Sequence, residues 1–180
     1  IYTEALGPEL TSLPATTKVI VPFSLIDLAH VYNRQAVPLC TPAQYLSLPP
    51  EREPEQALIE LENPGELAAL AGQLKNDTGA IIVFAFGTDY AAYQTAFRLK
   101  QQQNLSNPVI LRVVSQDTSH SQAQLAIASR IGGFFLDRLA AGLWITIPAL
   151  PYPEALELSR NILQSAGVRR YKTEFVSCPG

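Results

Sequence analysis

Residues 80–86 read Ala-Ile-Ile-Val-Phe-Ala-Phe, and residues 108–114 read Pro-Val-Ile-Leu-Arg-Val-Val. Both runs are nearly continuous in apolar residues and rich in the β-branched and aromatic side chains that favour strands. A strand without polar alternation has no face suited to water, so it is expected in a parallel sheet covered on both faces. We therefore predict that these two segments are central, parallel strands of an α/β fold.

Strand-like runs alternate with helical patterns on both sides of these segments. The further predicted strands are residues 18–23, 57–61, 134–137 and 143–147. The predicted helices are residues 25–32, 119–131 and 153–166, one that carries Leu67, Leu70 and Leu74, and one that carries Tyr90, Tyr93 and Phe97. Residues 41–56 hold four of the prolines and are expected to form an exposed excursion from the domain.

Three helix details can be predicted from single residues. Asn63 and Glu66 have the spacing of a capping box at a helix start. Gly167 is placed to end the last helix, and Arg169 and Arg170 follow it, where cations suit a helix C-terminus. Within the helix at 119–131, the periodicity predicts that Leu125, Ala128 and Ile131 face inward.

The strand count distinguishes two kinds of α/β sheet. About six strands can be counted by pattern, against the eight of a TIM barrel. Complete barrels usually take about 200–250 residues, which is more than this chain has. We expect a TIM-barrel-like or incomplete barrel with a mainly parallel sheet. An open, doubly wound sheet is the close alternative.

Composition excludes several classes of partner. The net charge is −3, and no run of Lys or Arg longer than Arg169-Arg170 is present to neutralise phosphates, so nucleic acid is not expected as a partner. No apolar run approaches the roughly 20 residues that cross a bilayer, so no membrane partner is expected. Cys40 and Cys178 do not make a disulfide framework, and the chain is expected to be cytoplasmic.

Acidic residues follow several predicted strands, where (β/α) enzymes keep their catalytic groups. They are Asp89, Asp117 and Asp137. Helix capping explains Asp89 and Asp117 equally well, and pairing with Arg138 or a backbone amide explains Asp137. Three acids that converge in one pocket would indicate an independent small-molecule enzyme of the α/β-barrel type. Acids that are each occupied in helix capping or local pairing would count against such an enzyme.

The last residues hold the most specific signal. Ser177-Cys178-Pro179-Gly180 places a cysteine and a proline at the end of an apolar strand-like run. Cys-Pro-x-Cys is a familiar arrangement for iron–sulfur ligation, in which thiolates converge on a cluster. A free, buried cysteine is the plain alternative for Cys178.

The stretch from residue 108 to residue 180 resembles part of the large-form, three-domain 4-hydroxy-3-methylbut-2-enyl diphosphate synthases. The segments that carry the likeness are Pro108-Val109-Ile110, Gly132-Gly133-Phe134-Phe135-Leu136-Asp137, Gly142-Leu143-Trp144-Ile145, Asn161-Ile162-Leu163-Gln164, Arg169, and Lys172-Thr173-Glu174-Phe175-Val176-Ser177-Cys178-Pro179. The last of these is the most specific. In that family it lies where an inserted middle domain leads into the iron–sulfur domain.

The resemblance implies a role in the non-mevalonate, methylerythritol phosphate route to isoprenoids. Enzymes of the family reduce 2-C-methyl-D-erythritol 2,4-cyclodiphosphate to 4-hydroxy-3-methylbut-2-enyl diphosphate. They take electrons from ferredoxin or flavodoxin through a [4Fe–4S] cluster. Cys178 matches the first of the three cysteines that ligate this cluster together with a glutamate. Glu174 does not match that glutamate, because it precedes the motif.

The resemblance also implies a division of the chain. We expect a lead-in at residues 1–17, an inserted α/β domain at 18–170, and the start of the iron–sulfur domain at 171–180. The chain would be an internal piece of a bacterial parent protein, with no complete catalytic or cofactor site and no cluster of its own. Its partners would be the N-terminal barrel and the C-terminal cluster domain of that parent.

Overall fold

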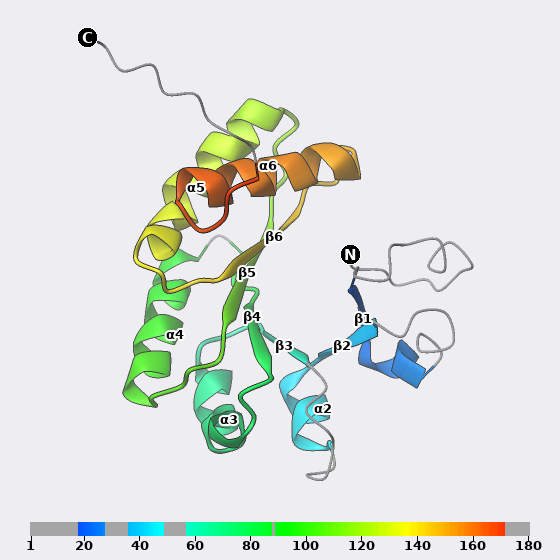
Figure 1. Cartoon of the computed structure of the whole chain (residues 1–180), viewed down its shortest axis with the longest axis vertical. Helices are drawn as coiled ribbons and strands as arrows, with labels where there is room; N and C mark the ends of the chain where they lie inside the picture. Colours follow the sequence, from blue (N-terminus) through cyan, green and yellow to red (C-terminus); the bar gives the residue numbers. More distant parts are fainter. Residues whose placement is uncertain (1–17, 28–35, 49–56, 88, 172–180) are drawn as a thin grey trace. The chain divides into compact units, whose positions relative to one another are not determined.

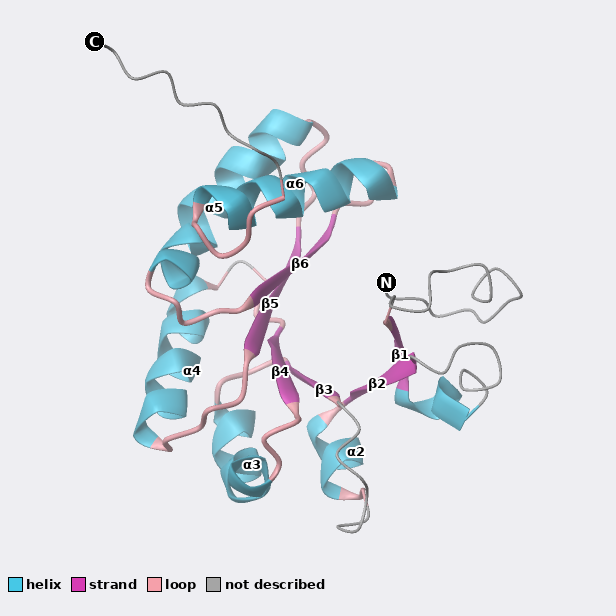
Figure 2. Cartoon of the chain, in the orientation of Figure 1, coloured by secondary structure: helices cyan, strands magenta, loops and turns pink. Residues whose placement is uncertain are grey.

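The computed structural model describes residues 18–27, 36–48, 57–87 and 89–171. Its elements alternate between strands and helices (Figures 1 and 2). They are β1 (Val19–Pro22), η2 (Phe23–Leu25), β2 (Ala36–Cys40), α2 (Pro42–Leu46), β3 (Leu58–Leu61), α3 (Gly65–Asn76), β4 (Ile81–Phe84), α4 (Tyr90–Gln102), β5 (Val109–Val114), α5 (His120–Leu136), β6 (Gly142–Thr146) and α6 (Tyr152–Ser165).

The strands of the described residues form a six-stranded sheet with the order β1-β2-β3-β4-β5-β6. The pairs β1–β2, β2–β3, β3–β4 and β5–β6 are parallel. Each strand lies beside the next one in sequence, as in a (β/α) barrel, whereas a doubly wound sheet reverses its order at a switch point. The expectation of a parallel, barrel-like but incomplete α/β sheet is confirmed, with β4 and β5 in the middle of the order as predicted.

The chain divides into two compact units, each described separately below. Unit 1 takes the described residues of Ile1–Phe86 and Ala91–Val109, and unit 2 takes those of Gly87–Tyr90 and Ile110–Gly180.

The core of unit 1 has an aromatic cluster between β4 and α4. Phe84 stacks on Phe86, with ring centroids 5.1 Å apart, and meets Phe97 edge-on at 5.2 Å. Phe86 packs against Tyr93 at 5.0 Å. The predicted face of α4 is confirmed for Tyr93 and Phe97, which are buried, whereas Tyr90 is exposed at the start of the helix.

Unit 1 also contains elements that the sequence did not predict. Residues 41–48 were expected to belong to an exposed excursion, and this is wrong. Thr41 and Gln44 form a capping box that starts the short helix α2, and its Tyr45 is only 1% exposed. The Tyr45 hydroxyl donates a hydrogen bond of 2.9 Å to Asp77 Oδ2, which ties α2 to the end of α3. Prolines suggested a loop, but Pro42 lies in the first turn of a helix, where no amide donor is required.

The predicted start of α3 is confirmed by its hydrogen bonds. The Glu66 amide donates to Asn63 Oδ1 at 3.2 Å, and the Asn63 amide donates to Glu66 Oε2 at 3.3 Å. The helix predicted at residues 25–32 is seen only at its beginning, because residues 28–35 lie outside the described ones. Residues 49–56 of the predicted excursion lie outside them as well.

In unit 2, α5 and α6 contact each other, and α6 contacts β6 (Figure 1). The strand predicted at residues 134–137 is wrong, because α5 continues through Gly132 and Gly133 to Leu136. The predicted inward face of α5 is also partly wrong, since Leu125 is 73% exposed. Ile131 is buried as predicted, and the other buried side chains of this helix are Ala123, Ile127, Phe134 and Phe135. Glycines lower helix propensity by only about 1 kcal/mol each, and burial of the flanking apolar side chains outweighs that cost.

Three helices end in the same way, with a left-handed residue after the last turn. These residues are Asn104 after α4, Arg138 after α5 and Gly167 after α6, with φ of 53°, 56° and 69°. In each case two amides turn back to the carbonyls of the last turn, which is a Schellman motif. The predicted end of the last helix at Gly167 is confirmed.

Candidate functional site

Asp117 lies in the turn that follows β5, at the carboxyl end of the strand. Ser115 Oγ donates a hydrogen bond of 2.6 Å to Asp117 Oδ2, and the Asp117 amide donates to Ser115 Oγ at 3.2 Å. This reciprocal pair fixes the turn between β5 and α5. The carboxylate of Asp117 is therefore engaged in local structure.

Asp137 lies at the opposite end of the sheet from Asp117. It is the C-cap of α5 and is exposed, whereas a position at the end of a strand was expected. The 17 residues of α5 separate the two acids, and a helix of that length spans about 25 Å. Because α5 returns from the carboxyl end of β5 to the amino end of β6, Asp117 and Asp137 cannot line one pocket.

Asp89 directly precedes α4, and its side chain is exposed. The residue before it, Thr88, lies outside the described residues. The structure thus does not bring the three strand-end candidates together. Within the described ranges, no group of three or more His, Cys, Asp and Glu residues could hold a metal ion.

The structure describes one of the two cysteines, Cys40, but not the other, Cys178. Cys40 is buried on β2, with 1% of its surface exposed, and it is not part of a disulfide bond. Cys178, which the sequence singles out as a cluster ligand, lies outside the described residues, as do Ser177, Pro179 and Gly180. Its role therefore stays a prediction.

Several known proteins are similar in sequence to part of this chain. One relative, from Chlamydia felis, is 41% identical over 81 residues, which cover 44% of this chain and 13% of the relative. Another, from Chlorobaculum tepidum, is 33% identical over 118 residues, 63% of this chain and 15% of the relative. A third, from Phocaeicola vulgatus, is 30% identical over 79 residues. Each is named 4-hydroxy-3-methylbut-2-en-1-yl diphosphate synthase (flavodoxin).

Over the aligned stretch, this chain is similar to the 4-hydroxy-3-methylbut-2-en-1-yl diphosphate synthases. The resemblance to this family that the sequence indicated is confirmed. The aligned stretch covers only about an eighth to a seventh of these synthases, since the shares are 13% and 15%. No family model and no solved structure matches the chain.

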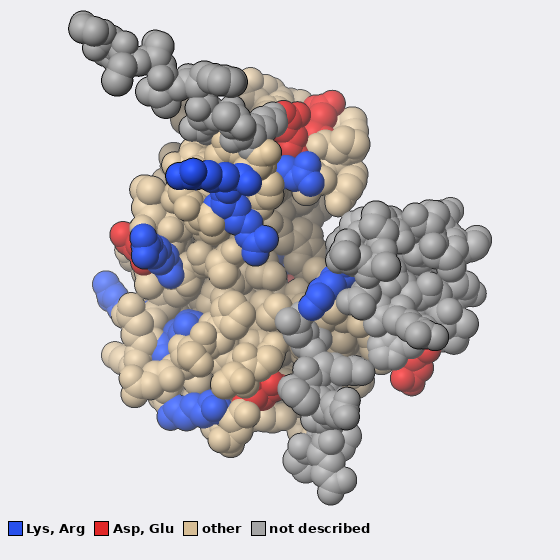
Figure 3. Space-filling model, viewed as in Figure 1, with Lys and Arg blue, Asp and Glu red and all other residues tan. Residues whose placement is uncertain are grey.

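No helix in the described parts of this synthase-related chain is long and apolar enough to cross a membrane. On the face shown in Figure 3, several Lys and Arg side chains lie over the C-terminal part of α6 and the turn after it, while others lie elsewhere on the same face. Arg160, Arg169 and Arg170 are the described basic residues of that region, and all three are exposed. The sequence predicted Arg169 and Arg170 there, but it gave no signal that Arg160 lies beside them.

Proposed function

We propose that this chain is the inserted middle domain, with the start of the iron–sulfur domain, of a large-form 4-hydroxy-3-methylbut-2-enyl diphosphate synthase. In the parent, a bacterial cytoplasmic protein, it acts as a spacer that sets the distance between the N-terminal barrel and the C-terminal cluster domain. The proposed boundaries are a lead-in at 1–17, the inserted domain at 18–170 and the cluster-domain entry at 171–180. The sequence similarity to the named synthases carries this proposal.

The parent would reduce 2-C-methyl-D-erythritol 2,4-cyclodiphosphate in the isoprenoid pathway. A [4Fe–4S] cluster would supply the electrons, received from flavodoxin, as in the names of the relatives, or from ferredoxin. Cys178 would be its first cysteine ligand, and the other ligands would come from the rest of the parent. The chain by itself is expected to bind no iron, and stoichiometric iron after anaerobic purification would contradict that expectation.

A non-catalytic role for the inserted domain is supported by the positions of its acids. Asp117 is engaged by Ser115, and Asp137 lies about 25 Å away along α5. Active sites of (β/α) folds gather their groups at the carboxyl end of the sheet, and Asp137 is at the other end.

Two cysteine variants of the full-length parent test the ligand assignment. Cys178→Ala should abolish the visible absorption of the cluster and the reductive turnover, while circular dichroism stays unchanged. Cys40→Ala is the matched control, because Cys40 is buried on β2 and should leave the iron content intact. A Cys178→Ala protein with a full cluster and normal turnover would refute the assignment.

The spacer role is tested in the same full-length protein by a triple variant, Asp89→Asn, Asp117→Asn and Asp137→Asn. If the inserted domain is a spacer, kcat stays within about twofold of the parent value. If the inserted domain supplies a general acid or base to the parent reaction, loss of its acids should lower kcat by a factor of about 100 or more. Such a fall, without loss of the cluster, would contradict a purely structural role.

A further inference from the structure

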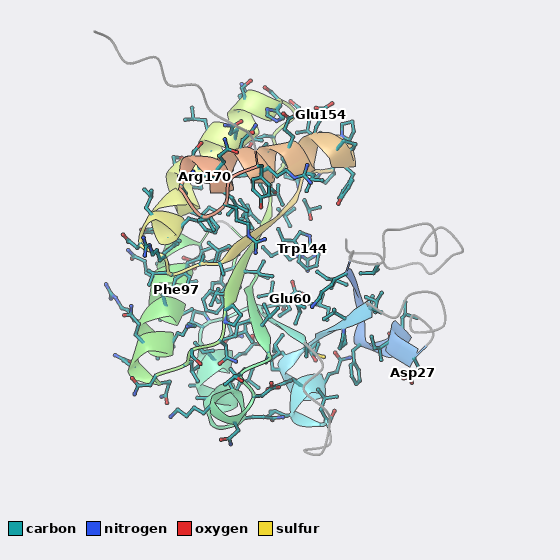
Figure 4. The ribbon with its side chains drawn as sticks, viewed as in Figure 1. Asp27, Glu60, Phe97, Trp144, Glu154 and Arg170 are labelled. Atoms are coloured by element: carbon teal, nitrogen blue, oxygen red, sulfur yellow. The ribbon has the colours of Figure 1, made fainter. Side chains whose placement is uncertain are left out.

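Three arginines share one end of unit 2, although they are separated in sequence. Arg160 lies on α6, and Arg169 and Arg170 follow the helix. Figure 4 places Arg170 near the C-terminal end of α6 and Glu154 near its beginning, so the charge changes sign along the helix. We call Arg160, Arg169 and Arg170 the arginine group.

The fold assembles the arginine group by turning the chain back after α6. Gly167, with φ of 69°, reverses the direction, and its amide donates to the Gln164 carbonyl at 2.9 Å. The Tyr171 amide then donates a hydrogen bond of 2.9 Å to Gln164 Oε1. The Arg160 guanidinium lies 5.6 Å from the centre of the Tyr171 ring, within the range of a cation–π interaction. These contacts hold residues 169–171 against the face of α6 that carries Arg160.

The helix macrodipole does not account for the whole arginine group. Cations near a helix C-terminus contribute about 0.3–1 kcal/mol, but the effect falls off within the last turn. The last turn of α6 has no basic residue, because Arg160 lies before it and Arg169 and Arg170 lie after the cap. A concentration of exposed positive charge on a chain with net charge −3 instead suits a partner of opposite charge.

We propose that the arginine group docks the acidic face of the small electron-carrier protein that reduces the parent enzyme. This inference rests on the proposed function. Cys178, the proposed cluster ligand, follows Arg170 by eight residues in the sequence. A carrier that binds the arginine group would therefore bind next to the chain segment that leads to this ligand. Long-range attraction between the charges would raise the rate of encounter.

The test uses the full-length enzyme with two alternative electron donors. In the docking variant, Arg160, Arg169 and Arg170 are replaced by Gln. In the matched control, the exposed arginines Arg98, Arg130 and Arg138 are replaced by Gln, so that both proteins lose three positive charges. Turnover is measured with reduced flavodoxin and, separately, with dithionite, a small reductant that needs no protein docking.

We expect the docking variant to lose about tenfold in kcat/KM for flavodoxin at 0.05 M salt, and the control variant less than about twofold. At 0.5 M salt the difference should nearly vanish, because the screening length falls to about 4 Å. Turnover with dithionite should be the same in all three proteins.

Two results would overturn the docking surface. Unchanged flavodoxin kinetics in the docking variant would show that the carrier binds elsewhere. An equal fall with flavodoxin and dithionite would show that the arginines contact the rest of the parent protein instead. Failure of the proposed function looks different, since the unsubstituted protein would then lack a cluster and would turn over with neither donor.

Discussion

The guanidinium of Arg112 lies over the indole ring of Trp144, with its central carbon 4.6 Å from the ring centroid. The two residues are register partners on the parallel strands β5 and β6, so they project from the same face of the sheet. Both are partly buried. Trp144 is the only tryptophan of the chain, which makes its fluorescence a specific probe of unit 2.

The Arg112–Trp144 contact should be measurable as a coupling energy. A double-mutant cycle with Arg112→Gln and Trp144→Leu should give an interaction of about 0.5–2 kcal/mol, the range of cation–π pairs at partly desolvated sites. Urea unfolding followed by circular dichroism provides the four free energies. Effects that add within about 0.3 kcal/mol would mean that the stacked geometry contributes nothing to stability.

The Schellman motifs after α5 and α6 predict opposite changes in stability when a glycine is introduced in one motif and removed from the other. Arg138 has φ of 56°, a conformation that costs an L-residue roughly 1–2 kcal/mol, so Arg138→Gly should stabilise the chain by about 0.5–1 kcal/mol after the entropy loss of glycine. Gly167→Ala, at φ of 69°, should destabilise it by about 1 kcal/mol. Thermal unfolding of both variants measures this, and shifts of the same sign would contradict the account.

The Tyr45–Asp77 hydrogen bond should contribute more than an ordinary neutral one. Its acceptor is a carboxylate whose other oxygen already accepts from the Gly79 and Ala80 amides, both at 3.1 Å. Tyr45→Phe should therefore cost about 1.5–3 kcal/mol of unfolding free energy. Tyr152→Phe is the control, because Tyr152 is 58% exposed and should change stability by less than about 0.5 kcal/mol. Equal effects of the two substitutions would show that the bond to Asp77 is not stabilising.

Burial predicts a loss of stability at high pH through Tyr93. Desolvation raises the pKa of Tyr93 from 10.0 to about 12, although a hydrogen bond with the Phe86 backbone opposes the shift. The folded state thus favours the neutral phenol. The contribution of the buried, neutral phenol to the free energy of unfolding is complete below pH 10. This contribution, at most about 3 kcal/mol, is lost as the pH rises from 10 to 12.

Tyr93→Phe separates this effect from that of Lys100. Burial lowers the pKa of Lys100, so deprotonation of Lys100 makes the folded state relatively more stable as the pH rises toward 10.5. Denaturant unfolding at pH 8, 10 and 11.5 should show a steeper loss of stability in the unsubstituted chain than in Tyr93→Phe. Identical pH profiles would contradict the buried-phenol explanation.

The sequence by itself determined the elements whose signals are local. The apolar runs at residues 80–86 and 108–114 specify buried parallel strands, because every exposed alternative would place apolar side chains in water. The bonds between Asn63 and Glu66 and the turn at Gly167 depend on residues within a few positions of each other. The similarity to the named synthases is likewise a property of residue order alone.

Only the tertiary structure decided the features that depend on distant partners. Tyr45 and α2 are ordered by Asp77, which comes much later in the sequence. The inward face of α5 is Ile127 and Ile131 and not Leu125, because contact with neighbouring elements selects among several apolar positions of the helix. Asp137 was predicted at the end of a strand, but it lies at the end of α5, because contact with neighbouring elements also decides where that helix ends. The three arginines of the arginine group come together because the chain folds back after Gly167. The hydrophobic periodicity of the sequence does not reveal such a reversal of chain direction.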